Sequence, residues 1–267
     1  MKATSTKVFL PLLACFSTLA VASDEAVDPG DHTKVNTAAS ITYGIQSLGE
    51  DDNNYVQVQG QISGSKANGN LFLGVLNVTA RENGKVGDDG FNASQVRARY
   101  FEVTPTGWDT APVFGMSFDY IDTSFTDGLS DRLFAVGAVL RVNPGFDNWL
   151  LFPNLAAVVG QNNDDFSDAG LVDDTSYGGQ LNLFNTIYFN KNGSHIQFNP
   201  QFSVIDMGSQ VGTVQTLQLE TAVMIPFDEN RKHWGKLTYN EYFDDAGQSF
   251  GHNDKNTELK FTYYYYF

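Results

Sequence analysis

Seven charged residues interrupt segments in which apolar side chains alternate with uncharged polar ones. The five cations and two acids are Arg97, Arg99, Arg141, Lys236, Lys260, Asp119 and Glu220. Guanidinium and ammonium groups donate hydrogen bonds to carboxylates and phosphates, so a surface lined by these cations would attract anions. In a second interpretation the charges pair with one another and only stabilise the interior. Both interpretations require elements that gather these side chains on one surface.

The four histidines give little support for catalysis. A hydrolase needs a nucleophile and a base within hydrogen-bond reach. Ser194 and His195 are adjacent, and adjacent side chains of a strand point to opposite faces. His252 lies near three aspartates, which leaves a hydrolase as an alternative. Because no phosphate loop, Cys/His cluster or nucleophile elbow occurs, the sequence predicts neither an enzyme nor a cofactor.

Paired aspartates are the one candidate for a metal site. Asp164, Asp165, Asp173 and Asp174 could bind a divalent cation through oxygen ligands and bridge it to phosphorylated lipid headgroups. Their spacing does not fit an EF-hand loop. Solvated acidic turns explain the pattern without an ion, and we favour that interpretation.

The N-terminus has the pattern of a secretory signal peptide. Lys2 and Lys7 precede an apolar run that ends in small residues at 20–22, so residues 1–22 are predicted to be removed. An alternative is that Cys15, which follows Leu-Leu-Ala, becomes a lipidated N-terminus. Residues 23–38 are polar and without period, and we predict a flexible periplasmic leader or a short plug.

The composition excludes several classes of protein. The chain has 267 residues, with 31 acidic against 16 basic side chains and a net charge of −15. Such an acidic chain is a poor partner for nucleic acid. No apolar run after the signal peptide is long enough for a transmembrane helix.

Segments of about ten residues alternate between apolar and polar side chains and are separated by Gly, Asn, Asp or Pro. This pattern is typical of a transmembrane β-barrel, with a soluble sandwich as the alternative. One face carries aliphatic and aromatic groups, which suit lipid, and the other carries Gln, Asn, Ser and Gly, which suit a wet lumen. We count twelve strands, although ten or fourteen would also fit, at residues 39–48, 54–64, 70–81, 94–104, 111–123, 132–143, 148–160, 176–190, 194–206, 213–226, 233–243 and 257–267.

The connections predict the orientation of this barrel. With both termini in the periplasm, the odd-numbered connections face outward and should be the longer ones. The third, fifth, seventh and eleventh connections are predicted to be long. Three tryptophans fall at even-numbered turns, where an aromatic belt at the membrane interface would place them: Trp108, Trp149 and Trp234.

The last nine residues, LKFTYYYYF, form a strand with one wholly apolar or aromatic face. That face consists of Leu259, Phe261, Tyr263, Tyr265 and Phe267. It resembles the C-terminal assembly signal of Gram-negative outer-membrane β-barrel proteins. The resemblance implies an outer-membrane location, contact with lipid and lipopolysaccharide, and handling by periplasmic chaperones and the barrel-assembly machinery.

Residues 39–267 are therefore expected to form one all-β barrel whose last strand closes against the first. Twelve strands leave room for a narrow pore, so we predict passive diffusion of small polar or anionic solutes. A structural or adhesive barrel without transport is the alternative. Gln197 and Asn199 join the seven charged residues as pore-lining candidates. The alternation breaks near Phe101 and Glu102, where a bulge would change the side that Arg97 and Arg99 face.

Overall fold

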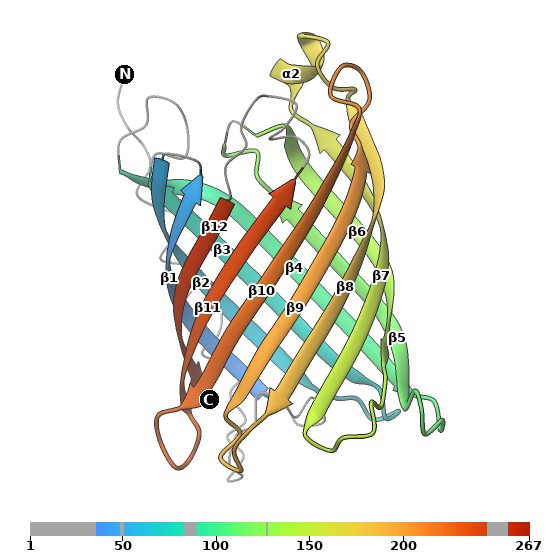
Figure 1. Ribbon diagram of the computed structural model, residues 1–267, viewed down its shortest axis with the longest axis vertical. Helices are drawn as coiled ribbons and strands as arrows, with labels where there is room; N and C mark the ends of the chain where they lie inside the picture. Colours follow the sequence, from blue (N-terminus) through green and yellow to red (C-terminus); the bar gives the residue numbers. More distant parts are fainter. Residues whose placement is uncertain (1–35, 49–50, 83–89, 127, 245–255) are drawn as a thin grey trace.

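The computed structural model describes residues 36–48, 51–82, 90–126, 128–244 and 256–267 (Figure 1). In this part of the chain, twelve antiparallel strands form one closed barrel in which each strand pairs with its neighbours in the sequence. The strands are β1 (Asn36–Leu48), β2 (Asp51–Ser65), β3 (Leu71–Glu82), β4 (Phe91–Pro105), β5 (Val113–Asp122), β6 (Ser130–Arg141), β7 (Trp149–Asn162), β8 (Thr175–Tyr188), β9 (His195–Asp206), β10 (Thr213–Pro226), β11 (His233–Asp244) and β12 (Asn256–Tyr266).

All twelve predicted strands are confirmed, and the bounds of β10 match the prediction. β1 begins at Asn36 rather than at residue 39, so residues 36–38 of the predicted leader belong to the barrel. The predicted signal peptide, Cys15 and the rest of the leader lie outside the described residues. In the described part of the chain, no helix has the length and apolar character needed to cross a membrane.

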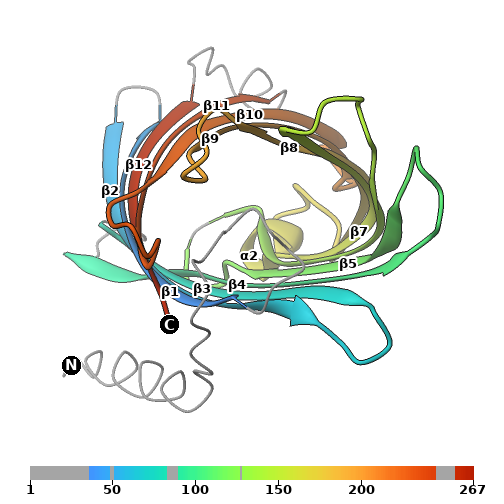
Figure 2. The same cartoon turned by 90° about the horizontal axis from the view of Figure 1, so that it is seen from below.

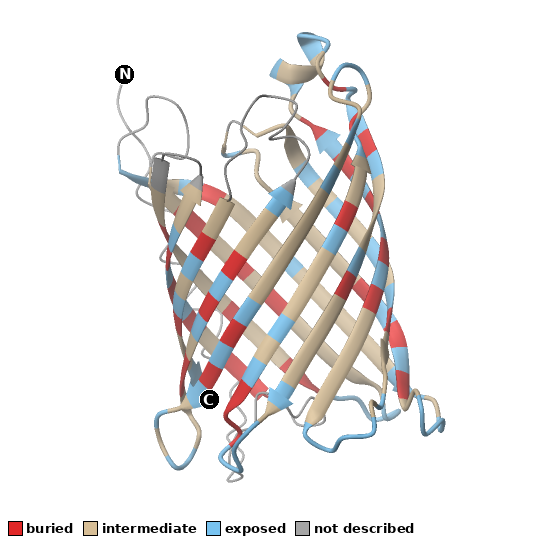
Figure 3. Cartoon of the chain, in the orientation of Figure 1, coloured by how far each residue is buried: buried red, intermediate tan, exposed pale blue. Residues whose placement is uncertain are grey.

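Exposed aliphatic and aromatic side chains cover most of the outer surface of the barrel, whereas the inner surface has many polar side chains. Along the strands, buried and exposed residues alternate (Figure 3). Ile41, Phe114, Leu155 and Phe261 are each at least half exposed on the outside. Their neighbours in the chain point inward, as the period of two requires. The two predicted faces are therefore both present, with the apolar face on the outside of the barrel and the other face inside it.

The two ends of the barrel differ. At one end, here the turn end, lie Phe267 and the connections 66–70, 106–112, 142–148, 189–194 and 227–232. At the other end, the loop end, residues 163–174 contain the short helix α2 (Asp164–Asp168), whose N-cap is Asn163. The fifth connection was predicted to be long, but it spans only residues 123–129 and is no longer than residues 106–112. Most of the third and eleventh connections lies outside the described residues.

The barrel closes where its last strand meets its first. Ile41 is paired with Tyr263 in the β1–β12 register, and the hydroxyls of Thr42 and Thr262 are hydrogen-bonded at 2.8 Å. The amide of Phe267 donates to the carbonyl of Thr37 at 3.0 Å. The prediction that the aromatic C-terminal strand closes the barrel is confirmed.

The predicted bulge near Phe101 is wrong. The register between β4 and β5 is continuous from Val96 to Pro105. The irregularity lies further along β3 and β4, where the pairing shifts between Thr79 and Ala80. Because the register is regular at positions 97–101, Arg97, Arg99 and Phe101 all face the lumen, as simple alternation requires.

Candidate solute site in the lumen

A cavity of about 220 Å³ lies inside the barrel and is lined by strands from β4 round to β11. Seven of the nine predicted pore-lining residues lie on its wall: Arg97, Arg99, Asp119, Gln197, Asn199, Glu220 and Lys236. Lys260 is not on this wall, although it interacts electrostatically with Glu220. Arg141 lies at the end of β6, on the same face as Ala135 but nearer the turn end, and does not line the cavity.

Arg97 and Asp119 form the first ion pair of the cavity wall. The register places Asp119 directly opposite Arg99, yet its carboxylate is bound by Arg97. The Arg97 Nε donates to Asp119 Oδ1 at 2.9 Å, and Nη2 donates to Oδ2. Such a two-point contact between a guanidinium and a carboxylate is a strong, oriented interaction. Asp119 is therefore already neutralised by a neighbour on its own side of the lumen.

Glu220 is the second acid of the wall and also has partners. Lys236 Nζ lies 3.5 Å from its Oε1 atom, and Asn199 Nδ2 donates to the same oxygen at 2.9 Å. Lys260 instead forms an ion pair with Glu258, at 3.0 Å. The interpretation that the charges pair with one another is thus correct for these groups.

The pairing leaves an excess of positive charge. Arg81, Arg99 and Arg141 face inward on β3, β4 and β6. None of the three forms an ion pair with any residue that the structure describes. The Nε atoms of Arg81 and Arg99 are also shielded from solvent without a hydrogen-bond partner there. The inner face of the described part of the barrel therefore carries three cations without an ion-pair partner.

Amide side chains form the wall opposite the arginines. Asn182 Nδ2 donates to Asn154 Oδ1 at 3.1 Å, and Gln180 Nε2 donates to Asn182 Oδ1 at 2.9 Å. Gln201 and Gln218 also line the cavity, opposite each other on β9 and β10. Of the amide side chains on the cavity wall, only Gln197 and Asn199 were predicted to line the pore. The remaining amides of β8, β9 and β10 could have been predicted in the same way, because Gln and Asn alternate with apolar residues along these strands.

Two phenylalanines narrow the lumen next to the charged residues. Phe101 of β4 and Phe184 of β8 come from strands that are not neighbours, yet their rings meet edge to face with centroids 6.1 Å apart. Both rings line the cavity. This contact was not predicted, because the alternation of side chains along a strand does not show which strands face each other across a barrel.

Beside β11, the turn end of the lumen is filled by an apolar cluster, which corrects the prediction for one tryptophan. Trp234 is fully buried on the inner face of β11, where it packs with Ala38, Met224 and Tyr266. Its indole Nε1 donates to the carbonyl of Arg231. Trp234 is therefore part of a packed core and not of an aromatic belt.

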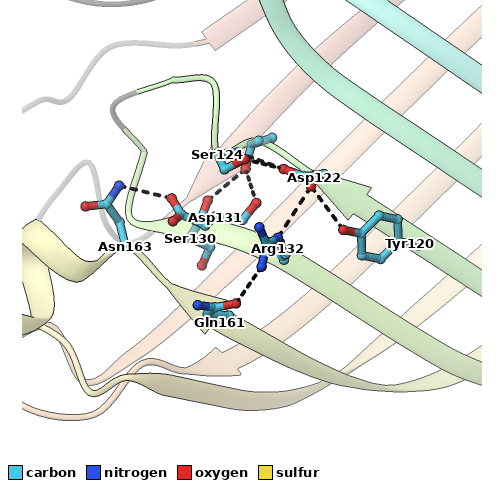
Figure 4. A network of polar contacts seen from close by, with 9 residues as sticks. Tyr120, Asp122, Ser124, Ser130, Asp131, Arg132, Gln161 and Asn163 are labelled. Carbon is cyan, nitrogen blue, oxygen red and sulfur yellow. Dashed lines mark hydrogen bonds and ion pairs between the residues drawn. The ribbon is translucent and has the colours of Figure 1, made fainter.

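At the loop end, a polar network ties the outer faces of β5, β6 and β7 together (Figure 4). Arg132 lies between two partners, with Nε 3.4 Å from Asp122 Oδ2 and Nη1 donating to Gln161 Oε1 at 3.1 Å. Tyr120 and Ser124 also donate to Asp122. The hydrogen bonds drawn in Figure 4 all join residues of this network to one another, so we interpret the network as a structural feature of the barrel rim.

The two described histidines have partners near the turn end, and the described aspartates form no metal site. His195 Nδ1 lies 2.9 Å from the Gly193 carbonyl, and His233 Nδ1 contacts the Tyr263 hydroxyl. His252, the base considered for a hydrolase, lies outside the described residues. Within those residues no group of three or more His, Cys, Asp or Glu side chains could hold a metal ion. The described acids of residues 164–174 therefore form no such site.

Comparison with known proteins identifies the fold. No protein-family model and no curated protein sequence matches the chain. An outer membrane channel from Pseudomonas putida F1 superimposes with a TM-score of 0.58 at 14% identity, covering 90% of this chain and 100% of the other. The translocator domain of the autotransporter NalP from Neisseria meningitidis has a TM-score of 0.51 at 10% identity, covering 90% of each chain.

A third solved structure has a different activity. Outer membrane phospholipase A from Escherichia coli superimposes with a TM-score of 0.50 at 12% identity, covering 87% of this chain and 90% of the other. At such low identity these similarities concern the fold alone. The closed barrel of twelve strands and these neighbours show that the chain has the fold of the solved outer-membrane β-barrels.

Proposed function

We propose that this protein is an outer-membrane channel for passive diffusion of small polar or anionic solutes, and that it has no enzymatic activity. The observation that carries the proposal is the polar cavity, whose described acids are paired while Arg99 on its wall is not. Unpaired cations in a low-dielectric channel attract anions and exclude cations. The similarity of the fold to a solved outer membrane channel supports the proposal.

The same proposal includes a route to the membrane. A cleaved signal peptide at residues 1–22 would deliver the chain to the periplasm, where chaperones would hold it unfolded. The barrel-assembly machinery would then recognise the outward-facing residues of β12 together with Phe267, which follows the strand. In the membrane, the outer face would contact lipid and lipopolysaccharide. Cleavage is tested by mass spectrometry of the protein isolated from membranes.

The channel is tested by single-channel recording of the refolded protein in a planar bilayer. We expect discrete conductance steps and, under a potassium chloride gradient, a reversal potential that reports selectivity for chloride. Heat-dependent mobility in gels serves as the control that the protein is folded. Absence of conductance from folded, inserted protein would contradict the channel, and cation selectivity would show that the acidic loop end controls permeation.

A further inference from the structure

We infer that the lumen cavity is a binding site for a small carboxylate that carries hydroxyl groups. Arg99 would hold the carboxylate, and Gln201 and Gln218 would hold the hydroxyls from the opposite wall. The inference rests on the proposed channel function and makes it more specific. A solute of this class would bind while it passes, so its transport would saturate.

Arg99 is the residue from which we infer that the ligand carries a carboxylate. Its guanidinium lines the cavity, and its Nε is shielded from solvent without a hydrogen-bond partner among the described residues. The two acids on the same wall are occupied, Asp119 by Arg97 and Glu220 by Lys236 and Asn199. A shielded polar group without a partner is rare in folded proteins. A carboxylate bound where the Arg99 side chain lines the cavity would supply the counter-charge that no described residue provides in an ion pair.

Two glutamines are the residues from which we infer that the ligand carries hydroxyl groups. Gln201 and Gln218 are directly opposite each other in the β9–β10 register, and both line the cavity. Neither side chain is hydrogen-bonded within the part of the chain that the structure describes. Each amide can donate and accept, which matches the donor and acceptor character of a hydroxyl group.

The two ends of the site face each other across the barrel. Seen along the axis, β4 and the β9–β10 pair lie on opposite walls (Figure 2). The cavity of about 220 Å³ has room for about seven water molecules at their liquid volume, which is the scale of a small organic acid. Phe101, two residues from Arg99 on the same face, and Phe184 supply an apolar surface for the carbon skeleton.

The test is the block of chloride current in single channels by three probes. Gluconate has both chemical features, butyrate has a carboxylate without hydroxyl groups, and glucose has hydroxyl groups without a carboxylate. We expect gluconate to block at a concentration at least about tenfold lower than either other probe, which corresponds to two-point binding. Equal block by gluconate and butyrate would overturn the inference, because the site would then read charge alone.

Two matched variants locate the site. Arg99→Gln is expected to raise the half-blocking concentration of gluconate by about tenfold or more. Arg141→Gln removes the same charge from the inner face of β6 outside the cavity, and should change that concentration less than about twofold. Gln201→Ala with Gln218→Ala should reduce the preference for gluconate over butyrate. Equal effects of the two arginine variants would contradict a site at Arg99.

Calorimetric titration of gluconate into the detergent-solubilised protein separates this inference from the proposed function. Binding that is lost in Arg99→Gln, in a protein that conducts no ions, would leave the site standing and overturn the channel. Ion conductance without gluconate binding would leave the channel standing and overturn the site. Heat-dependent gel mobility of each variant shows that it is folded.

Discussion

The middle of the lumen and its turn end are built from the same alternating strands but have opposite chemistry. In the middle, Arg97, Asp119, Glu220 and Lys236 surround a polar cavity together with amide side chains. At the turn end, the inner face of β11 instead places Trp234 in a buried apolar cluster. An inward-facing position of the barrel can therefore line a polar cavity or belong to an apolar core.

The two regions gain stability in different ways. The turn end buries apolar area, as a soluble core does, and its stabilisation should be insensitive to salt. The middle satisfies charges in pairs, and the gain from each pair is largely offset by the loss of hydration. We therefore expect the largest losses of stability from the turn end and the largest changes of selectivity from the middle.

Trp234→Ala should disrupt the apolar cluster at the turn end and cause the largest loss of stability. Removal of a fully buried indole is expected to lower the free energy of unfolding by about 3–5 kcal/mol. Urea unfolding in lipid vesicles measures this change. Trp108→Ala is the matched control, because Trp108 is 67% exposed in a turn and its loss should cost less than about 0.5 kcal/mol. Equal losses would show that Trp234 has no special structural role.

Phe184→Ala should widen the lumen where the rings of Phe101 and Phe184 meet. The variant loses the edge-to-face contact with Phe101, and we expect a loss of about 2 kcal/mol in the free energy of unfolding. Because this ring narrows the lumen, the single-channel conductance should increase. Phe202→Ala, on the outer face of β9, should leave the conductance unchanged. An unchanged conductance in Phe184→Ala would mean that the constriction lies elsewhere.

Arg97→Gln and Asp119→Asn test whether the charges in the middle of the lumen control ion selectivity. Of the three sets of variants, we expect these to have the smallest effect on stability. Each removes one partner of an ion pair, and the double variant should recover about 1 kcal/mol relative to the sum of the single losses. The reversal potential should move toward cation selectivity in Arg97→Gln and toward anion selectivity in Asp119→Asn. Shifts in the same direction would contradict a shared electrostatic role.

The fold could be predicted from the sequence because its signals are local. Alternation with a period of two fixed the strands and their faces, and turn residues fixed most connections. The chemistry of a single face was also readable, since Arg99 and Gln197 were expected in the lumen and line the cavity there.

The arrangement across the barrel could not be predicted in the same way. Which strands oppose each other depends on the closure and stagger of the whole sheet. The contact between Phe101 and Phe184 could therefore not be predicted from the sequence. The same holds for Asp119, which binds Arg97 although Arg99 is its directly paired residue. Trp234 was misplaced for a related reason, because proximity to a turn does not determine the face on which a side chain lies.

The closure between β1 and β12 also sets a kinetic requirement. The hydrogen-bonded hydroxyls of Thr42 and Thr262 are separated by 220 residues in the sequence. Bringing such distant segments together in a free chain costs about 5 kcal/mol of conformational entropy, from the logarithmic dependence on loop length. Until β12 has been made, β1 presents an open edge that can pair with another chain. Synthesis must therefore finish before the barrel can close, and aggregation competes with folding throughout that interval.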